Sequence, residues 1–255
     1  MIQKVFYFPQ TFPIFQEAYD FFVNTKKQTA TQHLFTNKQL RTLLVPIMVE
    51  QLLSSLMGTA DTMMVSNVGS AAISAVSLVD AINILVIQAL SALAAGGAIL
   101  CSQYLGSQNL KKAKRSAEQV LFVMLVLSCS LSLLCLIFRF PLLRLIFGTV
   151  DTDVMANSQI YFFFTLLSFP FIGLYDAGAS ILRAQNNTKG PMTISILSNF
   201  LNIGGNAILI FVFGMGVAGA AISPLVSRIF CAIVVIWQLR NHAEQNSVRN
   251  YFSLR

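Results

Sequence analysis

The chain has 255 residues, of which 55% are hydrophobic and only 11% are charged. Soluble domains carry about 25% charged residues, so this composition excludes an ordinary water-soluble protein and indicates that the bilayer surrounds much of the chain. The net charge of +7 would suggest a nucleic-acid-binding protein if the chain were soluble. Here the basic residues lie between apolar blocks, so membrane topology explains them better and we expect no nucleic-acid partner.

The first 41 residues are expected to form a cytoplasmic N-terminal segment. They contain Pro9, Pro13 and several lysines, without the compact apolar core and small-residue cleavage site of a secretory signal peptide. Their many aromatic side chains would suit the membrane interface. A disordered tail is the alternative interpretation.

Six apolar blocks follow, and each is longer than the roughly 20 residues that cross a hydrocarbon core. We therefore predict an all-α, polytopic membrane protein with a six-helix transmembrane lobe at 42–239 and a cytoplasmic tail at 240–255. The expected spans are 42–65, 73–103, 117–138, 158–182, 191–213 and 217–239.

The basic residues favour alternate loops. Fourteen of the 17 lie in the N-terminal segment, the loops after the second and fourth blocks, and the tail, whereas two lie in the loop after the third block. This is the positive-inside pattern. It predicts that both termini are cytoplasmic, which requires an even number of spans, in a multi-pass protein of the plasma (inner) membrane.

Four acidic residues lie inside the apolar blocks: Glu50, Asp61, Asp80 and Asp176. An aspartate at the centre of a membrane helix costs roughly 2.5–3.5 kcal/mol on insertion scales, so such residues indicate function by default. Glu50 and Asp61 are eleven residues apart, which places them on one face of the first helix about 16 Å apart.

Three asparagines of the fifth block, Asn199, Asn202 and Asn206, also share a helix face. With the carboxylates they predict a polar cavity whose acids exchange protons or bind Na⁺, with Asp61 as the possible Na⁺ ligand. Glu50 is included with the ion-coupling residues, and Asp80, Asn199 and Asp176 are expected to line the cavity. Hydrogen bonding between helices is the structural alternative.

Two further features stay open at the sequence level. Asp176 precedes Arg183 by seven residues, so an ion pair, a gate contact and substrate binding are all compatible with the spacing. Arg228, within the sixth block, is expected to pair internally or to face the cavity. Pro170 and Pro224 are expected to kink their helices.

Catalytic and nucleotide-binding motifs are absent from the sequence. It has no GxxxxGK[ST] phosphate loop, no HExxH and no GxSxG, and its four cysteines form no CxxC pair. We therefore expect neither an enzyme nor an ATP-driven transporter, and no cofactor or structural metal. Energy for transport would come from an ion gradient, carried by H⁺ or Na⁺, or from a partner.

Five stretches together resemble the multidrug and toxic compound extrusion (MATE) family. The segment from Pro46 to Ser66 resembles the first helix of that family, and the others follow in the family's order, at 75–80 with 102–106, 182–189, 202–210 and 216–222. The resemblance implies a cation-coupled antiporter that expels organic cations and drugs. It also implies twelve helices in two six-helix lobes, of which this chain is similar to the N-terminal one.

The resemblance also implies site roles. Asp61 falls where the family has its first-helix carboxylate, and Asn202 and Asn206 fall on the polar pair beside it. The chain departs from the family at Asn186, where glycine is frequent, and at Pro224, where threonine is common. A complete binding site would need a second six-helix lobe, from another chain or a homodimer. The alternatives are a flippase for lipid-linked precursors, which would need a more cationic cavity, and a fragment that does not transport.

Overall fold

The structure is a computed structural model that describes residues 37–148 and 150–246. The expectations for residues 1–36 and 247–255 lie outside the described residues. Within the described residues, the chain from Val45 onward forms one compact unit.

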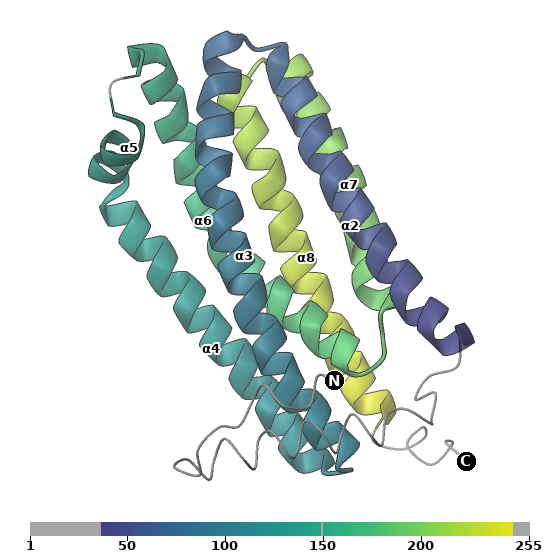
Figure 1. Cartoon of the computed structure of the whole chain (residues 1–255). Coiled ribbons are helices and arrows are strands. Elements are labelled where there is room, and N and C mark those ends of the chain that lie inside the picture. Colours follow the sequence, from purple (N-terminus) through teal and green to yellow (C-terminus); the bar gives the residue numbers. More distant parts are fainter. Residues whose placement is uncertain (1–36, 149, 247–255) are drawn as a thin grey trace, which may run out of the picture. The chain divides into compact units, whose positions relative to one another are not determined.

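Six long helices account for most of the described chain, and each is long and apolar enough to cross a membrane. This confirms the predicted all-α bundle of six spans, although the helices begin between one and seven residues before their predicted starts. The helices are α2 (Asn37–Ser66), α3 (Ser70–Gly106), α4 (Leu110–Ile137), α6 (Thr152–Ala184), α7 (Lys189–Asn206) and α8 (Gly216–Asn246) (Figure 1).

A short helix, α5 (Arg139–Phe147), occupies a region where the sequence predicted only a loop. Its proline, Pro141, lies in the first turn, where a missing backbone N–H does no harm. Leu143 is fully buried and anchors the helix. Gly148 ends it at a positive φ of 62°, which glycine adopts without steric strain.

The central helix is α6, which packs against α3, α4 and α8, while α7 packs against α8. Figure 1 shows α4 and α7 at opposite edges of this arrangement. The core between α3 and α6 contains Val79, Leu90, Phe162, Leu166 and Phe169, all at most 1% exposed. Lipid tails are as apolar as the core itself, so the hydrophobic effect does not drive these helices together. Close packing of such side chains stabilises the bundle instead.

A proline at the middle of α6 is compensated from a neighbouring helix. Pro170 has no N–H to donate to the carbonyl of Leu166, four residues earlier. The hydroxyl of Ser132 in α4 donates to that carbonyl over 2.6 Å. The freed acceptor is thereby satisfied within the membrane, and α6 continues without interruption to Ala184.

In contrast, residues 45–66 of α2 bury little of their surface. The side chains of Met48, Leu52, Leu56 and Met63 are all more than 60% exposed. They recur at helical spacing, so they form one apolar face. The polar contacts of α2, not extensive apolar packing, link it to the other helices.

Candidate functional site

The structure brings Asp61 together with the predicted asparagine pair. Asn206 donates from Nδ2 to Asp61 Oδ1 over 2.6 Å, and the same nitrogen lies 3.3 Å from Asn202 Oδ1. Both asparagines are fully buried, and Asp61 is half-buried. Because residues four apart stack on one helix face, Asn202 lies beside Asn206, whose amide contacts the carboxylate of α2.

The backbone around these asparagines is irregular. Ser223 of α8 donates to the carbonyl of Asn202 over 2.7 Å. Directly after Asn206 the helix changes to a π-helix, η1 (Ala207–Val212), where the sequence predicted an unbroken α-helix. Short π-helical segments are frequent at functional sites because they shift the register of the side chains that follow.

Asp80 belongs to the same region through a partner that the sequence reading missed. Tyr161 of α6 donates its hydroxyl to Asp80 Oδ1 over 3.2 Å. Tyr161 is only 6% exposed. A buried tyrosine hydroxyl needs a hydrogen-bond partner. A tyrosine within an apolar span was therefore the sequence feature that could have indicated a polar contact in the membrane.

Arg228 supplies a positive charge beside these acids. Its Nη1 donates to Ser168 Oγ over 2.6 Å, and its guanidinium interacts electrostatically with Asp61 and Asp80. Arg228 therefore interacts with groups inside the bundle, and its role in the cavity stays a prediction. The Asp61 cluster is defined here by six residues: Asp61, Asp80, Tyr161, Asn202, Asn206 and Arg228.

Glu50 lies in a different place. Arg183 Nη2 is 2.6 Å from Glu50 Oε1, and the hydroxyl of Tyr175 donates to the same oxygen over 3.0 Å. Arg183 thus makes its ion pair with Glu50 and not with Asp176, the partner that the spacing of seven residues had left open. The structure therefore separates Glu50 from Asp61, its predicted companion on the first helix.

The remaining predicted cavity residues are also placed. Asn199 is buried but donates to the carbonyl of Ser195 in its own helix, so it does not join Asp61. Asp176 interacts electrostatically with Glu50 and Arg183, and its Oδ2 is buried without a hydrogen-bond partner.

Polar residues follow one face of α6 between the two acidic regions. They recur at spacings of three and four, which is the period of a helix face that points into a bundle. Hydropathy does not reveal this stripe, because hydroxyl groups scarcely change the mean hydropathy of a span. Its members are Ser158, Tyr161, Thr165, Ser168 and Tyr175.

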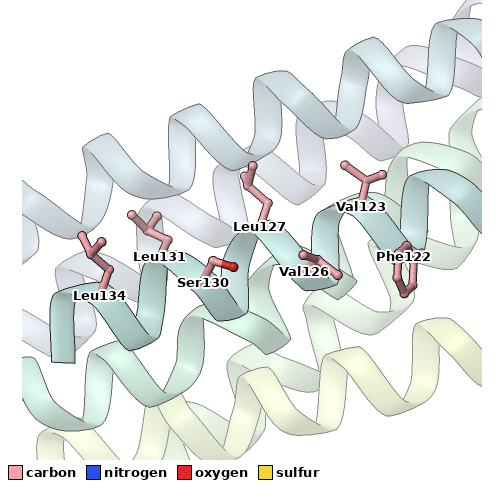
Figure 2. Close-up of a pocket in the computed structure, with 7 residues that line it drawn as sticks. All are labelled: Phe122, Val123, Val126, Leu127, Ser130, Leu131 and Leu134. Atoms are coloured by element: carbon pink, nitrogen blue, oxygen red, sulfur yellow. The ribbon is translucent and has the colours of Figure 1, made fainter. Parts of the chain in front are cut away.

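A surface groove runs along α4, away from these polar residues. Figure 2 shows that all seven residues lining it come from this one helix, and Ser130 is the only polar member. Such a groove has no charged group to bind or orient a polar ligand. Its composition is that of a face in contact with lipid.

A comparison with protein families shows which family the chain belongs to. The model of the MatE family matches residues 46–208, which include all of α3 to α7 and most of α2. The chain belongs to the MatE family. The matched segment contains Asp61, Asp80, Asn202 and Asn206, so most of the Asp61 cluster lies within it.

Two curated relatives of this MatE chain are named for transport and for multidrug resistance. It is 33% identical over 196 residues to the uncharacterized transporter YisQ of Bacillus subtilis, covering 75% of this chain and 42% of YisQ. It is 27% identical over 214 residues to the probable multidrug resistance protein NorM of Thermotoga maritima, covering 81% of this chain and 45% of NorM. The chain therefore spans less than half the length of these relatives.

Solved structures agree on the fold. A MOP superfamily transporter from Pyrococcus furiosus has a TM-score of 0.74 and 25% identity, over 79% of this chain and 44% of that one. An outward-facing multidrug resistance MATE family transporter has a TM-score of 0.75 and 24% identity, which supports the fold alone. The covered share is the one expected for a six-helix lobe of a twelve-helix transporter.

Proposed function

We propose that this MatE chain is the N-terminal lobe of a cation-coupled antiporter that exports organic cations, with Asp61 as its coupling carboxylate. The observation that carries the proposal is the contact between Asp61 and Asn206, a half-buried acid held by a fully buried amide. An acid in this position is anchored on one side and accessible on the other. It can exchange its proton with a second ligand.

The charges of the interior favour a cationic substrate. Four carboxylates lie in the two acidic regions, against the guanidinium groups of Arg183 and Arg228. A net negative interior attracts organic cations and repels phosphates. This balance supports drug export over the alternative of a flippase for lipid-linked precursors.

Antiport follows if the substrate and the coupling ion compete for the negative charge at Asp61. The two ligands then lower each other's affinity, which is negative coupling between them. We propose H⁺ as the coupling ion in preference to Na⁺. In support, a proton needs only one carboxylate oxygen, and the bond from Asn206 uses only Oδ1 of Asp61.

The membrane arrangement is part of the proposal. Both termini would lie in the cytoplasm, as the positive-inside pattern and an even number of spans require, in the plasma membrane. A second six-helix lobe, from another chain or from a homodimer, would complete the binding site. Rocking of the two lobes around that site would give alternating access.

The test is efflux of a fluorescent organic cation, ethidium, from cells that produce this chain. We expect Asp61→Asn to abolish efflux and Asp153→Asn, an exposed acid at the start of α6, to leave it unchanged. Efflux driven by a pH gradient without Na⁺ would support H⁺ coupling. Wild-type efflux in Asp61→Asn would contradict the role of Asp61, and membrane insertion without efflux would contradict a homodimer as the source of the second lobe.

A further inference from the structure

The region around Glu50 is a second polar site that the role of Asp61 leaves unexplained. We define the Glu50 cluster as Glu50 of α2 with Tyr175, Asp176 and Arg183 of α6. The side chain of Glu50 is only 10% exposed, and that of Arg183 is 31% exposed. About 16 Å of helix separates Glu50 from Asp61, so the two clusters are separate sites.

Several polar atoms in this cluster have no hydrogen-bond partner although they are buried. They are Glu50 Oε2, Asp176 Oδ2 and Arg183 Nε. An unpaired polar atom in a buried position destabilises the fold, and a charged one does so more strongly. Glu50 uses its other oxygen for both Arg183 and Tyr175, so the protein side chains satisfy only half of its carboxylate.

The charges in the cluster do not balance. Glu50 and Arg183 form one neutral ion pair, which leaves Asp176 as an extra acid. The charged groups that face Asp176 are Glu50 from α2, Arg183 from α6 and Arg228 from α8; Cys231 of α8 faces the neighbouring Tyr175. Arg183 is already paired with Glu50, and Arg228 with Ser168 and the acids of the Asp61 cluster.

We propose that Asp176 is a second proton-binding site of the lobe, holding one proton while Glu50 stays ionised against Arg183. This rests on the proposed function and raises the number of protons that the lobe can exchange from one to two. A proton suits the site better than a metal ion, because the described residues offer no group of three acidic, His or Cys ligands. A protonated carboxyl also gains an O–H donor in a cluster with two unpaired carboxylate oxygens.

Difference infrared spectroscopy of the purified chain in lipid nanodiscs tests this directly, because a protonated carboxyl group has its own C=O stretching band. On acidification of the wild type we expect two such bands from buried acids. Asp61→Asn should remove one, Asp176→Asn should remove the other, and Asp153→Asn should remove neither. Circular dichroism and size-exclusion chromatography confirm that each variant is folded.

A second variant separates a proton site from a structural role. Glu50→Gln releases Arg183 to neutralise Asp176 on its own helix, so the Asp176 band should disappear although Asp176 is still present. Persistence of that band would overturn the arrangement proposed for the cluster. If Asp176→Asn gives the wild-type spectrum, the second site is overturned, whereas an Asp61 band that remains titratable would leave the proposed function intact.

Discussion

At the residue scale, the contact between Asp61 and Asn206 joins two helices through groups that hydrocarbon cannot solvate. Each group relies on the other, because no water is present in the bilayer core to replace a lost partner. Hydrogen bonds to charged groups contribute about 1.5–3 kcal/mol, and those between membrane helices average about 0.6 kcal/mol. A single amide can therefore matter for both stability and coupling.

This leads to a prediction for Asn206→Leu, which keeps the branched shape of the side chain and removes its donor. Asp61 would lose its 2.6 Å hydrogen bond, so we expect the free energy of unfolding to fall by about 1–2 kcal/mol. The measurement is denaturant unfolding in detergent followed by circular dichroism. Asn199→Leu is the matched control, because Asn199 bonds only within α7; equal losses in the two variants would contradict the special role of Asn206.

The residues of the candidate site were only partly predictable. A spacing of eleven residues placed Glu50 and Asp61 on one helix face, and spacings of three and four did the same for the asparagines of α7. Periodicity describes one helix at a time, however, and it contains no information on which residue of another helix stands opposite. The contacts of Glu50 with Arg183 and of Asp80 with Tyr161 therefore needed the structure.

At the scale of elements, the close approach of α4 and α6 depends on a glycine. A Cβ at Gly173 would lie 2.7 Å from Ser128 Oγ and 3.3 Å from the backbone oxygen of Met124. Ser128 is fully buried and the backbone oxygen cannot turn aside. The helices would have to move apart to accommodate a side chain.

We therefore predict that Gly173→Ala lowers the free energy of unfolding by about 1–3 kcal/mol through overpacking. Thermal unfolding of the purified chain measures the change. Gly58→Ala is the control, because a Cβ there would meet nothing within 4 Å and alanine favours the helix by up to about 1 kcal/mol. A Gly173→Ala variant as stable as the wild type would show that α4 and α6 are not packed as closely as the structure indicates.

The elements themselves followed closely from the sequence, with two exceptions. Membrane spans are long enough for hydropathy to locate them, and all six were placed within a few residues at most ends. The nine residues of α5 are too few to cross a membrane and so gave no hydropathy signal. The π-helix η1 is a change of backbone hydrogen bonding, which composition does not encode.

At the scale of the whole molecule, α2 is the element most open to change. Only 11% of the apolar 18-residue stretch of α2 is buried, against 50% of the corresponding stretches of α6 and α8. Its acids join it to α6 through Glu50 and to α7 through Asp61. Protonation of either acid weakens one of these attachments, which would link proton binding to the position of the helix.

The most direct test of the account is proton release on binding of an organic cation, measured with the purified chain in weakly buffered lipid nanodiscs. If ethidium and H⁺ compete for Asp61, adding ethidium to the wild type releases protons into solution. Asp61→Asn should bind ethidium more weakly and release fewer protons. Ethidium binding that releases no protons from the wild type, or release that is unchanged in Asp61→Asn, would contradict coupling through Asp61.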